Sequence, residues 1–189
     1  MTINRNNSNS VHFSIWNEIK WKPTKKQLDQ FSQLQVLLQQ WNKKTNLTRL
    51  VDGNDYWVSQ VLDSLWPFHD ELKKPINSHK YIDVGSGCGF PGLAIAIALP
   101  NANITLLDSS SKKTTFLKEV TKEMGMDSRT TIVKERAEIA GKNNALRGHF
   151  DYAIARAVAP TTVSAINAIT LSGPKFKILS SNSFATLCP

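Results

Sequence analysis

Apolar residues recur every three or four positions in the first third of the chain. After Pro23, residues Thr24 to Gln27 fit a capping box, and the periodic positions that follow predict an amphipathic helix. These positions are Leu28, Phe31, Leu34, Leu38 and Trp41. A second helix is predicted from near Asn54 to the residue before Pro67, since a helix usually ends ahead of a proline.

From Lys80 the pattern changes to short apolar runs that alternate with helical stretches. The predicted strands are 81–84, 104–107, 131–133, 151–155 and 176–179. The predicted helices run through Leu99, from Lys112 to Met124 before Gly125, and over 161–171. Such alternation is typical of an α/β fold with a parallel, Rossmann-like sheet. We therefore expect a disordered tail at 1–12, an N-terminal helical extension at 13–74 and a Rossmann-like core at 75–189.

All five tryptophans lie in the N-terminal third, at Trp16, Trp21, Trp41, Trp57 and Trp66. We expect most of them to pack the helices against the sheet. A role as stacking platforms for nucleic-acid bases is the alternative.

Composition adds a bias toward polyanionic partners. The chain has 23 Lys and Arg against 15 Asp and Glu, a formal charge of +8, which favours nucleic acid but also fits an ordinary basic surface. Its longest apolar run, 93–99, is too short to span a bilayer, so no membrane association and a cytoplasmic location are expected. Cys88 and Cys188 lie far apart and predict neither a disulfide framework nor a metal site.

A glycine-dense turn follows the first predicted strand. Gly87, Gly89 and Gly92 fit the GxGxxG spacing, which dinucleotide-binding folds share with many other loops. Asp83 precedes them, and a carboxylate there would repel a pyrophosphate. The same carboxylate would favour the cationic ammonium and sulfonium groups of S-adenosylmethionine, which we predict as the cofactor.

Acidic residues also follow the next two strands. Asp108 ends the second strand, where it can accept hydrogen bonds from ribose hydroxyls or, alternatively, cap the next helix. Glu138 follows the third strand and would reach the same sheet edge near an adenine ring, although a plain surface role is equally compatible.

The order of several motifs over residues 24–160 resembles the ribosomal RNA small subunit methyltransferase G family, also called glucose-inhibited division protein B. The motifs are Trp41-Asn42, Asn46-Leu47-Thr48, Leu62-Asp63-Ser64-Leu65, the run from Asp83 to Gly92, Leu107-Asp108-Ser109, Lys112-Lys113 and Ala155-Arg156-Ala157. The resemblance implies methyl transfer from S-adenosylmethionine to N7 of a guanine in 16S small-subunit rRNA, by a protein that we expect to be a monomer.

The resemblance also implies positions for the cofactor contacts. They are Gly85 and Phe90 in the glycine turn, Asp108 at the ribose, Ala137 and Glu138 near the adenine, and Arg156 after the fourth strand. Asp83 and Gly87 complete the candidate cofactor site. Candidate phosphate contacts for RNA are Lys43, Lys44, Arg49, Lys112 and Lys113, although charge runs are usually solvated faces.

The predicted chemistry needs no catalytic acid or base. Guanine N7 presents a lone pair and has no proton to lose, so alignment in a dry site is the expected source of catalysis. We hypothesise that Arg156 holds the cofactor carboxylate or the guanine edge. Its alternative is a structural ion pair with Asp83 or Asp151.

The chain departs from the family pattern in two places. Gln60 stands where members commonly have a histidine. After Ser172-Gly173-Pro174-Lys175 only one strand is predicted, so the last two strands of a seven-stranded sheet are expected to be missing, which would expose a sheet edge. An RNA-binding remnant without catalysis is therefore one alternative, and a dinucleotide-dependent oxidoreductase is another.

Overall fold

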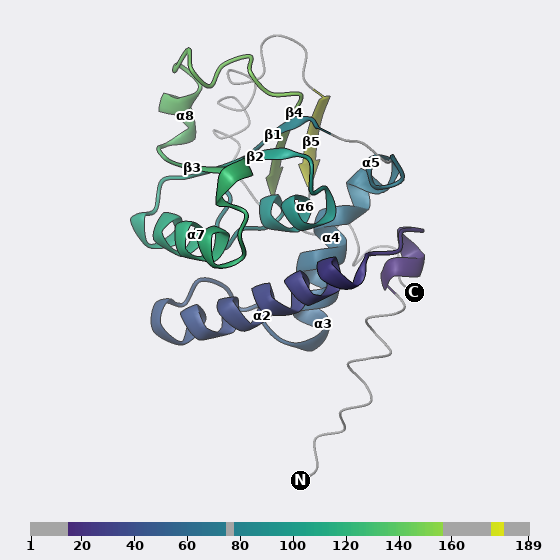
Figure 1. Ribbon diagram of the computed structural model, residues 1–189. Coiled ribbons are helices and arrows are strands. Elements are labelled where there is room, and N and C mark those ends of the chain that lie inside the picture. The colour runs from purple at the N-terminus through teal and green to yellow at the C-terminus, as the bar shows by residue number, and fades with distance from the viewer. Residues whose placement is uncertain (1–14, 75–77, 157–174, 180–189) are drawn as a thin grey trace.

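The computed structural model describes residues 15–74, 78–156 and 175–179. A parallel sheet runs through its centre in the order β3-β2-β1-β4-β5 (Figure 1). The strands are β1 Lys80–Val84, β2 Asn103–Asp108, β3 Thr130–Lys134, β4 Tyr152–Arg156 and β5 Lys175–Leu179. The five predicted strands and the Rossmann-like fold class are confirmed. The expected tail at 1–12 and the helix at 161–171 lie outside the described residues.

Helices α6 (Gly92–Ala98) and α7 (Ser111–Glu123) follow β1 and β2, as predicted. Every residue of α6 is buried, because its sequence is wholly apolar apart from glycine and it lies between the sheet and the N-terminal helices. Gly125 has φ +63° just after α7, the left-handed conformation that closes many helices. The short segments η3 (Asp127–Arg129) and α8 (Ala137–Ala140) flank β3.

Helix α2 (Lys25–Thr45) forms the outer layer and lies across α6 and α7 (Figure 1). The predicted capping box is present, with the Thr24 hydroxyl accepting from Gln27 N and the Gln27 side chain accepting from Thr24 N. The other end of the Gln27 amide donates to the carbonyls of Ile97 and Ala98 at 3.1 and 3.0 Å. One side chain therefore caps α2 and fixes it to the end of α6.

The tryptophans pack into the core that the helices share with the sheet, and their ring contacts are with helical residues. Trp16 and Trp57 are buried, and the other three are partly buried against the same core. Trp41 meets Phe116 of α7 edge to face, with ring centroids 5.6 Å apart. This contact brings the end of α2 beside the first turns of α7.

The second predicted helix begins where expected but is not one regular α-helix. Its segments are α3 (Gly53–Tyr56), a π-helix η1 (Trp57–Leu62), α4 (Asp63–Leu65), a 3₁₀ turn η2 (Trp66–Phe68) and α5 (His69–Leu72). Helix α4 ends before Pro67, as expected, but helical turns continue through the proline as 3₁₀ structure and become α-helical again in α5. The hydrophobic pattern could not predict the π-helix, because this wider helical turn still buries the apolar side chains of the segment, as an α-helix would.

No helix in the described part of the chain is both long and apolar enough to cross a membrane.

Candidate functional site

A cavity of about 280 Å³ opens at the carboxyl ends of β1 to β4, where parallel α/β sheets usually bind ligands. It is lined by Gly85, Leu107, Asp108, Ser109, Lys113, Glu135, Arg136, Ala137, Glu138 and Arg156. Because the strand order is β3-β2-β1-β4, Glu138, Asp108, Gly85 and Arg156 follow one another across the edge of the sheet. Five of the eight predicted cofactor residues therefore share one cavity.

Gly85 forms the exposed floor of the cavity. Its φ of +79° is a conformation that favours glycine, and its N–H donates to Leu107 O at 2.8 Å. The next N–H, of Ser86, donates to the same carbonyl at 3.0 Å. These bonds continue the pairing of β1 with β2 and leave bare backbone facing the cavity, so a ligand can approach closely.

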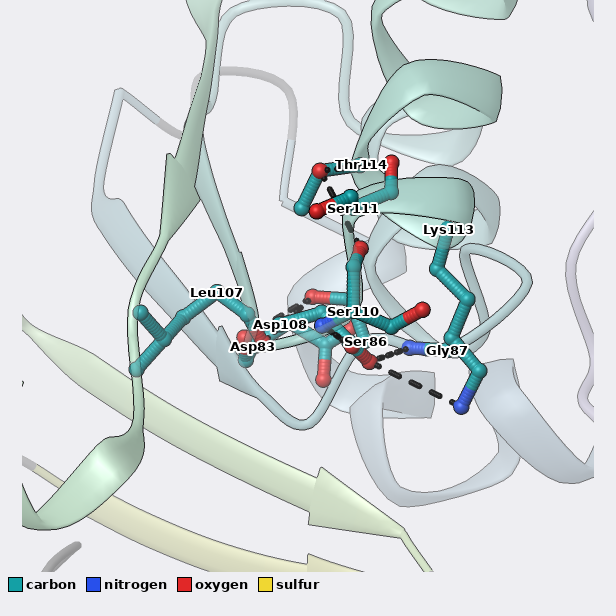
Figure 2. A network of polar contacts seen from close by, with 9 residues as sticks. All are labelled: Asp83, Ser86, Gly87, Leu107, Asp108, Ser110, Ser111, Lys113 and Thr114. Carbon is teal, nitrogen blue, oxygen red and sulfur yellow. Dashed lines mark hydrogen bonds and ion pairs between the residues drawn. The ribbon is translucent and has the colours of Figure 1, made fainter.

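Asp108 ties the glycine turn to the start of α7 (Figure 2). Its Oδ2 accepts from Gly87 N at 2.9 Å, its Oδ1 accepts from Ser110 N at 2.8 Å, and the Lys113 ammonium lies 3.9 Å from Oδ2. Ser110 is the N-cap residue of α7, so Asp108 supports the helix start without being the cap itself. Each carboxylate oxygen can accept a further hydrogen bond, which keeps the predicted ribose contact available.

Asp83 lies beneath the turn and does not line the cavity. It is fully buried, and its Oδ2 accepts from Gly92 N, the first N–H of α6, at 2.9 Å. Its Oδ1 has no hydrogen-bond partner among the described residues. Burial raises the pKa of Asp83 to about 7, against the lowering effects of the Gly92 N–H and the Arg156 charge. The carboxyl therefore titrates near neutral pH in the folded chain.

Two further predicted residues support the cavity from behind. Phe90 is buried, and its ring lies 5.9 Å from the guanidinium carbon of Arg156. Gly87 is tied to Asp108 by its N–H. Neither is among the residues that line the cavity.

Arg156 closes the β4 end of the cavity and is held by the π-helix and the helix after it. Its Nη1 donates to Ser59 O at 2.9 Å and lies 3.5 Å from Asp63 Oδ2, and its Nη2 donates to Gln60 Oε1. The sequence-based alternative of an ion pair with Asp83 or Asp151 was wrong in its partner, because Asp63 of α4 reaches the guanidinium instead. Burial raises the pKa of Asp63, and the Arg156 charge opposes that rise.

The basic candidates fall into two groups. Lys113 belongs to the cavity, with its ammonium near Asp108, while Lys112 is exposed on the first turn of α7. Lys43 and Lys44 are exposed at the end of α2 and Arg49 is exposed on the following loop. The Trp41–Phe116 contact joins α2 to α7, the helix that carries Lys112 and Lys113.

Sequence reasoning missed several residues that line the cavity, namely Leu107, Ser109, Glu135 and Arg136. All of them flank the carboxyl ends of β2 and β3. Their position next to predicted strand ends was the available signal. With them, the charged lining from the described part of the chain holds three acids and three bases, Asp108, Glu135, Glu138, Lys113, Arg136 and Arg156.

The parallel sheet and the glycine turn at its carboxyl edge define a Rossmann-like fold of the class I methyltransferase type. A crystal structure from Methanococcus maripaludis, named for S-adenosyl-L-methionine-dependent methyltransferases, shares this fold with a TM-score of 0.51 at 21% identity, over 62% of this chain and 54% of that one. The family model for rRNA small subunit methyltransferase G matches residues 27–180, and the chain belongs to that family.

Curated relatives carry the same family name. The chain is 66% identical over 165 residues to Ribosomal RNA small subunit methyltransferase G of Prochlorococcus marinus strain NATL2A. The aligned region covers 87% of this chain and 66% of the relative. It is 48% identical over 177 residues to the protein of that name from strain MIT 9303, covering 91% of this chain and 72% of the relative. The chain thus spans about two thirds of the length of these relatives.

Proposed function

We propose that this chain binds S-adenosylmethionine and methylates N7 of a guanine in 16S small-subunit rRNA. Family membership supports RNA methyl transfer, and the names of the curated relatives specify the small subunit. The choice of guanine N7 comes from the family resemblance. We further propose that the protein acts in the cytoplasm as a monomer.

The cavity suits the three parts of this cofactor. Glu138 and Ala137 at the β3 end suit an adenine, Asp108 at the β2 end suits ribose hydroxyls, and Gly85 lets the sulfur end lie against bare backbone. Arg156 at the β4 end then faces the amino-acid part, whose carboxylate it can bind. The bound cofactor would supply a methyl group activated by a positively charged sulfur.

The hydrogen bond from Gly92 N to Asp83 Oδ2 is the observation that favours S-adenosylmethionine over a dinucleotide cofactor. In dinucleotide-binding folds the pyrophosphate binds the N–H groups at the start of the first helix. Here the first N–H of α6 is already bonded to Asp83 Oδ2, and Pro91 before it has no N–H. The balanced charge of the cavity lining adds no attraction for a dianionic group, so an oxidoreductase function is disfavoured.

The protein's own part in the reaction is to align the reactants and exclude water. A nucleophile without a proton needs no base, and none of the cavity carboxylates has to accept one. Positioning of this kind can supply up to about 7–11 kcal/mol of the barrier reduction. Arg156 and Gly85 are suited to fix the cofactor end that faces the incoming base.

Cofactor binding is the first test. We expect saturable, micromolar binding of S-adenosylmethionine to the purified chain by titration calorimetry, and none of NAD⁺ under the same conditions. The opposite preference would contradict the proposal. Cofactor binding without methyl transfer to small-subunit RNA would favour the RNA-binding remnant instead.

The exposed cations provide a second prediction. Exchanging Lys43, Lys44 and Lys112 together for glutamine should weaken RNA binding and lower the slope of log K against log salt by about 0.7 to 0.9 per lost phosphate contact. Cofactor affinity should stay unchanged, because none of the three lines the cavity. Filter binding at several salt concentrations measures the slope, and an unchanged slope would remove these lysines from the RNA interface.

A further inference from the structure

Gln60 occupies the centre of the contacts that hold Arg156. It lies in the middle of the π-helix and is only 1% exposed. On one side its Oε1 accepts from Arg156 Nη2. On the other its Nε2 lies 3.4 Å from Thr48 Oγ1, 3.5 Å from Leu50 O and 3.7 Å from Cys88 Sγ. Four separate segments of the chain therefore meet at one side chain.

Chemistry fixes which way the Gln60 amide faces. A guanidinium can only donate and the Leu50 carbonyl can only accept, so Oε1 must face Arg156 and Nε2 must face the loop. A flipped amide would lose its hydrogen bonds to Arg156 and Leu50 O. A buried amide with a single satisfied orientation holds its neighbours in place.

Among the described residues, the polar contacts of the Arg156 guanidinium all come from one helical segment. Ser59 O, Gln60 Oε1 and Asp63 Oδ2 all come from the helical segment of residues 53–72. The guanidinium has more N–H donors than these three acceptors use, and it also lines the cavity. Its position therefore leaves donors for a carboxylate in the cavity.

We propose that Gln60 is a positioning residue that sets the direction of the Arg156 guanidinium at the β4 end of the cavity, so that Arg156 can bind the carboxylate of the cofactor's amino-acid part. This inference rests on the proposed function. Gln60 itself does not line the cavity and acts through Arg156. Without the Gln60 oxygen, the guanidinium keeps its contacts with Asp63 and Ser59 O but loses the acceptor of the hydrogen bond that its Nη2 donates.

The test compares two ligands that differ in the carboxylate. S-adenosylhomocysteine carries the amino-acid part, whereas 5′-methylthioadenosine keeps the adenosine and sulfur without it. In Gln60→Met, we expect affinity for S-adenosylhomocysteine to fall about tenfold, as for a weakened charge-assisted hydrogen bond. Affinity for 5′-methylthioadenosine should change less than about twofold, because that ligand lacks the group bound by Arg156.

Two variants separate positioning from general support of the structure. Gln60→His keeps both an acceptor nitrogen for Arg156 and an N–H for Leu50 O in its neutral imidazole, and should retain S-adenosylhomocysteine affinity within about threefold. Gln35→Leu removes a different loop anchor, the bond from Gln35 Nε2 to Val51 O at 3.1 Å, and should leave both affinities unchanged. Thermal melting confirms that each variant is folded, and if Gln60→Met does not fold, Gln60→His decides alone.

The outcomes distinguish this inference from the proposed function. Wild-type protein that binds neither ligand would overturn both. If the wild type binds the ligands, three results would overturn the positioning role alone. They are unchanged affinities in Gln60→Met, an equal loss of affinity for the two ligands in that variant, and a similar loss of affinity in Gln35→Leu. A large loss of S-adenosylhomocysteine affinity in Gln60→His would overturn it as well.

Discussion

Replacing Gly92 by alanine is expected to destabilise the fold by about 2–3 kcal/mol, the usual cost of forcing a group into a packed core. A Cβ at this position would lie 2.7 Å from Asp83 Oδ2 and would also collide with the Leu106 side chain. The carboxylate cannot move away without losing its bond to Gly92 N, and Leu106 is fully buried in β2. Urea unfolding of the variant and the wild type measures the difference.

Gly125→Ala is the matched control for this substitution. Gly125 has open space around its Cβ position but a positive φ of +63°, so alanine there meets only the backbone cost of about 1–2 kcal/mol. A Gly92→Ala variant no less stable than Gly125→Ala would show that the packing around Asp83 is looser than the structure indicates.

Asp83 should make the stability of the protein depend on pH. Its pKa is about 7 in the folded chain against an ordinary value of 3.8, so the folded state binds the proton more tightly than the unfolded state does. The stabilisation from this proton is complete below about pH 4 and is lost as the pH rises through 7. Between pH 5 and pH 7 the folded state holds this proton and the unfolded state does not, so the free energy of unfolding falls by about 1.4 kcal/mol per pH unit. Between pH 5 and pH 8 we therefore expect a total loss of about 3 kcal/mol.

Asp83→Asn isolates this contribution, because its amide oxygen can still accept from Gly92 N but does not titrate. The free energy of unfolding of the wild type minus that of the variant should fall across this pH range. Other groups titrate in both proteins and cancel in the difference. A difference that is flat with pH would mean that Asp83 is ionised throughout, with an unseen partner at Oδ1.

The periodic and alternating patterns predicted most of the fold because each reflects one local requirement. The Thr24 capping box, the end of α7 at Gly125 and the five strands all follow from backbone propensity and burial within short segments. The π-helix could not be predicted this way. One of its contacts is with Arg156, which lies 96 positions after Gln60, and no local pattern records a contact over that separation.

The site was predicted in part for the same reason. Asp108 and Glu138 could be predicted because Asp108 ends β2 and Glu138 follows β3, and parallel strands bring their carboxyl ends to one edge of the sheet. Asp83 was correctly placed beside the turn, but its depth was not foreseen: the prediction gave it direct attraction for the ligand, whereas the structure gives it the first N–H of α6. Whether a side chain at a strand end points into the cavity or into the core depends on the packing of the following helix.

The complete burial of α6 has a consequence for how the chain can be divided. One face of this helix meets the sheet and the other meets α2 and α4, so the helical extension serves as the second wall of a shared core. A fragment beginning at β1 would leave an apolar helix face open to water and would also lack Gln60 and Asp63. The stretch between α5 and β1 is therefore a boundary in the sequence but not in the folded protein, and the ligand cavity and the core should be lost together in a single unfolding transition.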